Sequence, residues 1–156
     1  MMDFDVQLAN LSMAEDITDV LLQGEDEGFV FPPDRTVILE YVKEIMNRNG
    51  GIIGVIYDHD NKIVEGVIGL RLDKFWFSDQ WFIKDIFMYV HPEFRRSTRA
   101  KCLIAFAKEC AKKMNIPLLM GIMSNIRTEA KAKLYERQMN RAGSFFVFNN
   151  ESVGVS

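Results

Sequence analysis

Three arginines, Arg95, Arg96 and Arg99, stand close together between a segment with strand periodicity and a segment with helical periodicity. The first turn of a helix presents unpaired backbone N–H groups at the positive end of the helix dipole. Such a turn is suited to bind phosphate, and guanidinium groups add charge and forked hydrogen-bond donors. The sequence therefore predicts an anion site in the turn Arg95–Ala100.

The alternative is that these arginines form an ordinary solvated face, as most runs of charge do. Cations at the N-terminus of a helix oppose its dipole, however, and a bound anion would remove that conflict. The pattern therefore favours the anion site.

A strand before this turn and a helix after it are expected to fix its position. Residues Trp81–Val90 alternate as a strand does, and His91-Pro92 ends it. The alternation predicts one face with Ile86, Met88 and Val90, and the other with Asp85, Phe87 and Tyr89. From Ala100 to Met114, apolar residues follow helical spacing.

The remaining pattern predicts one domain, residues 1–156, of mixed α/β class. The expected order is strand, two helices, three strands, helix, strand, helix, strand. The strand–helix–strand unit Trp81–Met123 requires a parallel pair within a mixed sheet. The other expected elements are a strand over Phe4–Leu8, a helix after Ser12, a helix with N-cap Asp34, strands Ile52–Tyr57, Ile63–Leu72 and Leu118–Met123, a helix Glu129–Gln138 and a strand Gly143–Asn149.

Composition narrows the functional classes. The chain has 156 residues, 48% apolar and 26% charged, with a formal net charge of −3, which gives no basic field for nucleic acid. No apolar run is long enough for a membrane span, and the acidic N-terminus lacks signal-peptide features. Cys102 and Cys110 are predicted to be buried thiols of a cytoplasmic protein, and no metal site is expected.

The turn and its lead-in resemble those of the GNAT superfamily of N-acetyltransferases. The lead-in is Val90-His91-Pro92-Glu93-Phe94-Arg95, and the turn is Arg95-x-x-Thr98-x-Ala100, with Thr98 where glycine is usual. The hydroxyl of Thr98 could donate a hydrogen bond or cap the helix. The order of elements agrees over nearly the whole chain. The Arg-Arg-Ser form is also similar to bacteriophage acetyltransferases.

The resemblance implies acetyl-CoA as cosubstrate, with its pyrophosphate on the backbone amides of Arg96 through Ala100. It implies that the strands Trp81–Val90 and Leu118–Met123 splay apart and that the pantetheine arm bonds the backbone of Phe87–Val90. Asn125 would touch the cofactor arm or order the following loop; a turn or cap role is equally open. The implied cofactor-binding residues are Phe87, Met88, Tyr89, Val90, Arg95, Arg96, Ser97, Thr98, Arg99, Ala100 and Asn125.

The resemblance also points to residues for the transfer. Tyr135 matches the tyrosine that protonates the leaving thiolate, and its alternative is a core aromatic beside Leu134. Asp85 could take an amine proton through water, or could instead pair with Lys84 or Lys74. Glu65 is a second candidate for the base.

The expected function is acetyl transfer to an amine of a small molecule or a protein. The alternative is a non-catalytic acyl-CoA- or protein-binding module on the same fold, such as a phage-encoded host-protein modulator. Two aromatic clusters, Phe29–Pro32 and Phe75–Phe77, are expected to shape the acceptor pocket. The acceptor and the oligomeric state stay open, and a homodimer is compatible with the sequence.

Overall fold

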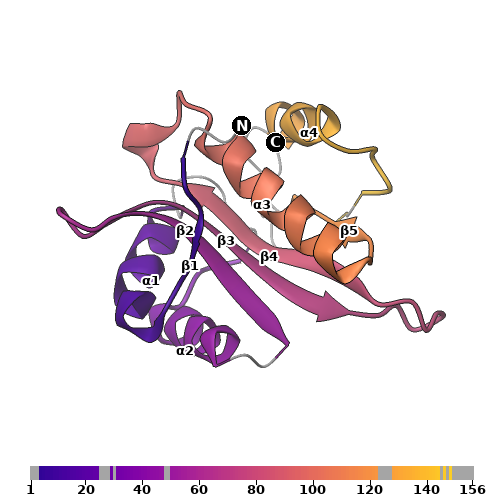
Figure 1. Ribbon diagram of the computed structural model, residues 1–156, viewed down its shortest axis with the longest axis horizontal. Coiled ribbons are helices and arrows are strands. Elements are labelled where there is room, and N and C mark those ends of the chain that lie inside the picture. Colours follow the sequence, from indigo (N-terminus) through magenta and orange to yellow (C-terminus); the bar gives the residue numbers. More distant parts are fainter. Residues whose placement is uncertain are drawn as a thin grey trace.

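A mixed five-stranded sheet forms the centre of the protein (Figure 1). The computed structural model describes residues 4–24, 29, 31–47, 50–122, 128–144, 146 and 148. The strands lie in the order β1-β2-β3-β4-β5; the first four are antiparallel, and β4 and β5 are parallel. Their bounds are β1 Gln7–Leu8, β2 Gly51–Asp58, β3 Ile63–Asp73, β4 Phe82–Val90 and β5 Leu118–Leu119.

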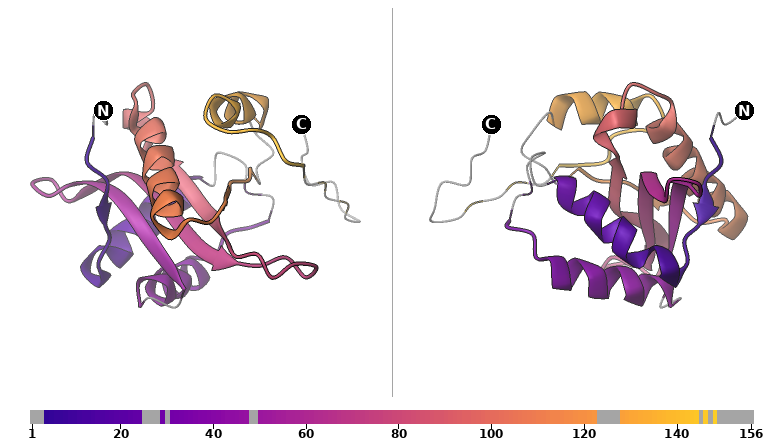
Figure 2. Two further views of the ribbon diagram at one scale, coloured as in Figure 1. Left: turned by 45° about the vertical axis from the view of Figure 1, so that its right-hand side comes forward. Right: turned by 90° about the vertical axis from the view of Figure 1, so that its left-hand side faces the viewer.

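Helices cover both faces of this sheet, as the two views of Figure 2 show. Helices α1 and α2 lie on one face and α3 lies on the other; each face has its own cluster of buried apolar side chains. Helix α4 lies along the same edge of the molecule as the turn before α3. The helices are α1 Ala14–Leu22, α2 Arg35–Met46, α3 Arg99–Met114 and α4 Thr128–Glu136, with short 3-10 turns Leu11–Met13 and Pro92–Phe94.

The helix boundaries follow from local chemistry. Asp34 caps α2, because its carboxylate accepts a hydrogen bond from the backbone N–H of Val37 at 3.2 Å. Helix α3 buries Leu103, Ile104 and Ala107 on the face toward the sheet, and Asn115 ends it in the left-handed conformation.

The predicted mixed α/β class is confirmed, as is the parallel pair joined by a helix. Two strand predictions differ from the structure at the described residues. The strand expected over Leu118–Met123 pairs with β4 only at Leu118–Leu119, because the chain then moves away from β4. Of the strand predicted over Gly143–Asn149, the described residues 143, 144, 146 and 148 do not lie in a strand, and Phe146 and Phe148 are more than 90% exposed; the other three residues lie outside the described part of the chain.

The predicted division of β4 into two faces is correct for Met88 with Val90 and for Phe87 with Tyr89, but it was wrong for Ile86 and Asp85, because the strand contains a β-bulge. Phe87 pairs with Gly69 and Asp85 pairs with Leu70, so that Ile86 has no counterpart on β3. Ile86 and Phe87 consequently both pack on the α1–α2 side. An extra residue reverses the alternation, which leaves Asp85 on the α3 side with Ile83.

Candidate functional site

The edge of β4 facing β5 is paired over only part of its length. Ile83 pairs with Leu118 and Lys84 pairs with Leu119, and in the described part of the chain the pairing stops there. From Asp85 to Val90, the described residues give β4 no strand partner other than β3, and the Val90 carbonyl accepts a hydrogen bond from Arg95. Backbone groups along such an edge are available to a ligand that can pair as a strand does. Phe87, Met88, Tyr89 and Val90 all lie on this segment.

The open edge leads directly into the turn that the sequence singled out. Thr98 occupies the N-cap position of α3, but its side chain forms no capping hydrogen bond with the helix. The hydroxyl of Ser97 accepts a long hydrogen bond of 3.3 Å from the N–H of Arg99 and donates to the carbonyl of Phe94 at 2.5 Å. Ala100 lies in the first turn, where backbone N–H groups have no partner within the helix. The positive end of α3 is therefore only partly capped by its own side chains.

The three arginines of the turn have different surroundings. Arg95 folds back onto β4: its Nε donates to the carbonyl of Val90 at 3.0 Å, and its guanidinium lies 5.0 Å from the centre of the Tyr89 ring. Arg99 donates through Nε to Glu65 at 2.9 Å, and both side chains are about 85% buried. Of the three arginines, only Arg96 is exposed.

Asp85 lies where β4 and β5 separate. Its Oδ1 accepts a hydrogen bond from the backbone N–H of Gly121 at 2.9 Å. Burial raises the pKa of this carboxyl group to about 6, from an ordinary value of 3.8. The lysines considered as its partners pair elsewhere, Lys84 with Asp73 and Lys74 with Asp79. Asp85 is thus an acid whose protonation changes near neutral pH, as a general base requires.

Tyr135, on α4, lies within electrostatic range of Asp85. Burial raises the pKa of its phenol, and the negative charge of Asp85 raises it further. The hydroxyl therefore keeps its proton at neutral pH, as a proton donor must. Residues 50 positions apart in the sequence are brought together here, with the open edge of β4 beside them.

Two other candidates have different outcomes. Glu65 is held in the ion pair with Arg99. Asn125 lies outside the described residues.

The two aromatic clusters lie at opposite ends of β4. Phe29 approaches Tyr89, since both rings lie within 4 Å of the position that a Cβ on Gly24 would occupy. Beyond the start of β4, the rings of Phe75 and Phe77 stack and Trp76 meets Phe77 edge to face; Trp76 is 95% exposed. Of these aromatic residues, Phe29 is the one placed near the open edge.

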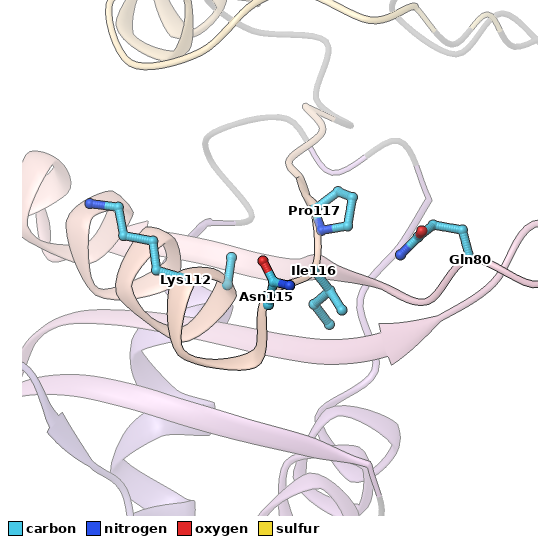
Figure 3. Close-up of a pocket in the computed structure, with 6 residues that line it drawn as sticks. Gln80, Lys112, Asn115, Ile116 and Pro117 are labelled. Atoms are coloured by element: carbon cyan, nitrogen blue, oxygen red, sulfur yellow. The ribbon is translucent and has the colours of Figure 1, made fainter.

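A surface hollow beside α3 is separate from this site (Figure 3). It is lined by Gln80, Ala111, Lys112, Asn115, Ile116 and Pro117. It lies where β4 begins and α3 ends, at the far end of both elements from the turn. It holds no pair of acidic and basic groups, and we assign it no role.

Sequence reasoning missed the bulge, the bond from Gly121 to Asp85 and the pair Arg99–Glu65. Opposite charges at positions 65 and 99 were visible, but 34 residues separate them and only the sheet brings them together.

Over the described ranges, no helix is long and apolar enough to cross a membrane, and no cluster of side chains could hold a metal ion.

The protein is thus a mixed α/β domain in which two parallel strands diverge beside the N-terminus of a helix. The family model for the acetyltransferase (GNAT) domain matches residues 49–138, and the chain belongs to this family. The match supports the GNAT resemblance and gives no support to a bacteriophage-type origin. A search of curated proteins finds no match.

Solved structures share the fold at low sequence identity. An acetyltransferase of Trypanosoma brucei is 18% identical with a TM-score of 0.71, covering 96% of this chain and 100% of that one. A ribosomal-protein-alanine N-acetyltransferase of Brucella melitensis is 18% identical with a TM-score of 0.69, covering 93% and 98%. AAC(6')-Iy, solved with the bisubstrate analogue CoA-S-monomethyl-acetylneamine, is 15% identical with a TM-score of 0.71, covering 96% and 99%.

Proposed function

We propose that this protein transfers the acetyl group of acetyl-CoA directly to an amine of a small molecule or a protein. The observation that carries the proposal is the open edge of β4, which leads from Asp85 straight to the N-terminus of α3. A pantetheine arm has amide groups that can pair with Phe87–Val90 as a strand would. The pyrophosphate would then lie at the amides from Arg96 to Ala100.

The three arginines of the turn have different roles in binding the cosubstrate. Arg96 is exposed at the helix N-terminus and supplies charge to the pyrophosphate. Arg95 and Arg99 are held against β4 and Glu65, and they fix the shape of the turn.

Asp85 and Tyr135 take the protons of the reaction. The amine nitrogen attacks the thioester carbonyl carbon; a C–N bond forms and the C–S bond breaks. The amine loses a proton to Asp85 through water, and Tyr135 donates a proton to the departing sulfur. A carboxyl group with a pKa of about 6 is ionised at pH 7 and can accept that proton. A site of this kind needs no metal, and we expect the protein to act in the cytoplasm.

The test combines binding and turnover. Titration calorimetry with acetyl-CoA measures affinity, and thiol release with a panel of amines measures transfer. Arg96→Glu is compared with Lys113→Glu, which makes the same charge change on an exposed residue at the other end of α3. We expect Arg96→Glu to weaken binding about tenfold or more, in the range of a lost charge-assisted hydrogen bond.

Equal affinity in the two variants would remove the turn from the site. Binding of acetyl-CoA by the wild type without thiol release from any amine would favour the non-catalytic binding module.

A further inference from the structure

Strands β4 and β5 separate at one definite position. Extending the register of Ile83 with Leu118 and Lys84 with Leu119 would set Asp85 opposite Met120. The N–H of Gly121 would then bond a main-chain carbonyl of β4, as in any parallel ladder. Instead it donates to the side-chain Oδ1 of Asp85, at 2.9 Å. A side chain has replaced the main chain as the acceptor at the first position where the strands diverge.

This replacement increases the separation of the strands. A carboxyl oxygen reaches further from its Cα than the carbonyl oxygen of the same residue does, so Gly121 is held at a greater distance from β4. The bulge at Ile86 follows immediately and bends β4. The bond also satisfies a polar atom of a partly buried carboxyl group, which would otherwise be costly to bury.

We propose that Asp85 is the positioning residue that opens the fork between β4 and β5. Its carboxyl group binds the Gly121 amide and holds the chain after β5 away from β4. Among the described residues, β4 therefore has no strand neighbour on this side after Lys84, which leaves space for the pantetheine arm. This positioning role rests on the proposed function, because the open edge matters only if a cosubstrate binds there. It is separate from proton transfer, because positioning requires a hydrogen-bond acceptor and no charge.

The experiment separates the acceptor from the charge. Asp85→Asn keeps an oxygen for Gly121, and Asp85→Ala removes it. Hydrogen exchange of the Gly121 amide, followed by NMR, reports on the bond itself, and calorimetry reports the affinity for coenzyme A. We expect Asp85→Asn to keep both near wild-type values. Asp85→Ala should speed Gly121 exchange and weaken coenzyme A binding by roughly tenfold, the loss expected for one hydrogen bond and its geometry.

A second pair of variants changes the donor and covers the case in which Asp85→Ala does not fold. Gly121→Pro removes the N–H, and Gly121→Ala keeps it. We expect only the proline variant to weaken coenzyme A binding, again by about tenfold.

Unchanged binding in both Asp85→Ala and Gly121→Pro would overturn the proposal. So would equal loss of affinity in Asp85→Asn and Asp85→Ala, since that would make the charge the essential feature. If the wild type does not bind coenzyme A, the proposed function fails, while Gly121 exchange in the Asp85 variants still decides whether the bond holds the fork.

Discussion

Asp85 and Tyr135 are titratable groups near the fork between β4 and β5, and their surroundings change the pKa of each. Burial raises the pKa of both, and the charge of Asp85 raises that of Tyr135 further. Near neutral pH the carboxyl group is ionised and the phenol is protonated. The two groups are therefore in the forms that proton acceptance from an amine and proton donation to a thiolate require.

The raised pKa of Asp85 makes the free energy of unfolding depend on pH. Between about pH 4 and pH 6 the native protein keeps the Asp85 proton while the unfolded chain has lost it. Native stability therefore falls as pH rises through this window, and a pKa difference of this size corresponds to roughly 3 kcal/mol. Urea unfolding at pH 4 and pH 6.5, which span most of this window, should show the wild type losing about 2 kcal/mol relative to Asp85→Asn. A constant difference between the two proteins would contradict the raised pKa.

Tyr135→Phe tests the proton donor. We expect the turnover number to fall about 100-fold, the lower end of the contribution of a general acid. The dissociation constant for acetyl-CoA should stay within about twofold, because the phenol acts on the sulfur only as the bond breaks. Tyr41→Phe is the control: its hydroxyl accepts from Arg71, and it lies on α2. Thiol release at saturating acetyl-CoA measures the effect, and unchanged turnover would exclude Tyr135 from the mechanism.

At the scale of elements, β3 and β4 pack closely against each other at the bulge. A Cβ on Gly69 would lie 2.6 Å from the ring of Phe87, which is too close for any side chain there. Glycine at this position allows two consecutive residues of β4, Ile86 and Phe87, to pack on one face. The bulge and the site edge that follows it thus depend on the absence of a side chain on the neighbouring strand.

Gly69→Ala should destabilise the protein by roughly 1–3 kcal/mol, the usual cost of overpacking. Gly66→Ala is the matched control on the same strand, where the nearest atom is a methyl group of Leu103 at 3.2 Å, which can move more easily. Urea unfolding measures both variants. Combining Gly69→Ala with Phe87→Leu should restore part of the loss; an equal cost at both glycines would argue against the close contact at Phe87.

Helices and strands with a clear hydrophobic periodicity could be predicted from the sequence. The side-chain arrangement of the candidate site could not. Helix α3 and strands β2, β3 and β4 follow from periodicity, because each buries one face or both along its own length. The bulge at Ile86 has no local signature, so the face carrying Asp85 was predicted wrongly. The pairing of Glu65 with Arg99 depends on the tertiary fold, which no local pattern encodes.

At the scale of the whole molecule, the proposed cosubstrate would contact three different elements at once. The β4 edge, the N-terminus of α3 and helix α4 all border the fork. A ligand bound there should therefore stabilise the native state as a unit.

Acetyl-CoA at 100 times its dissociation constant should raise the free energy of unfolding by about 2.7 kcal/mol. Hydrogen-exchange mass spectrometry should localise the protection to Phe87–Val90 and to the first turn of α3. Protection at the hollow of Figure 3 instead, near Lys112 and Asn115, would place the ligand elsewhere.

The contact between Phe4 and Arg99 has a practical consequence for how the protein is produced. The Arg99 guanidinium lies 4.0 Å from the centre of the Phe4 ring and 4.6 Å from that of Phe94. Phe4 thus packs against a side chain of the first turn of α3. An affinity tag fused directly before Phe4, or a shortened N-terminus, would disturb this stacking, so a carboxyl-terminal tag is the better choice for measuring affinities.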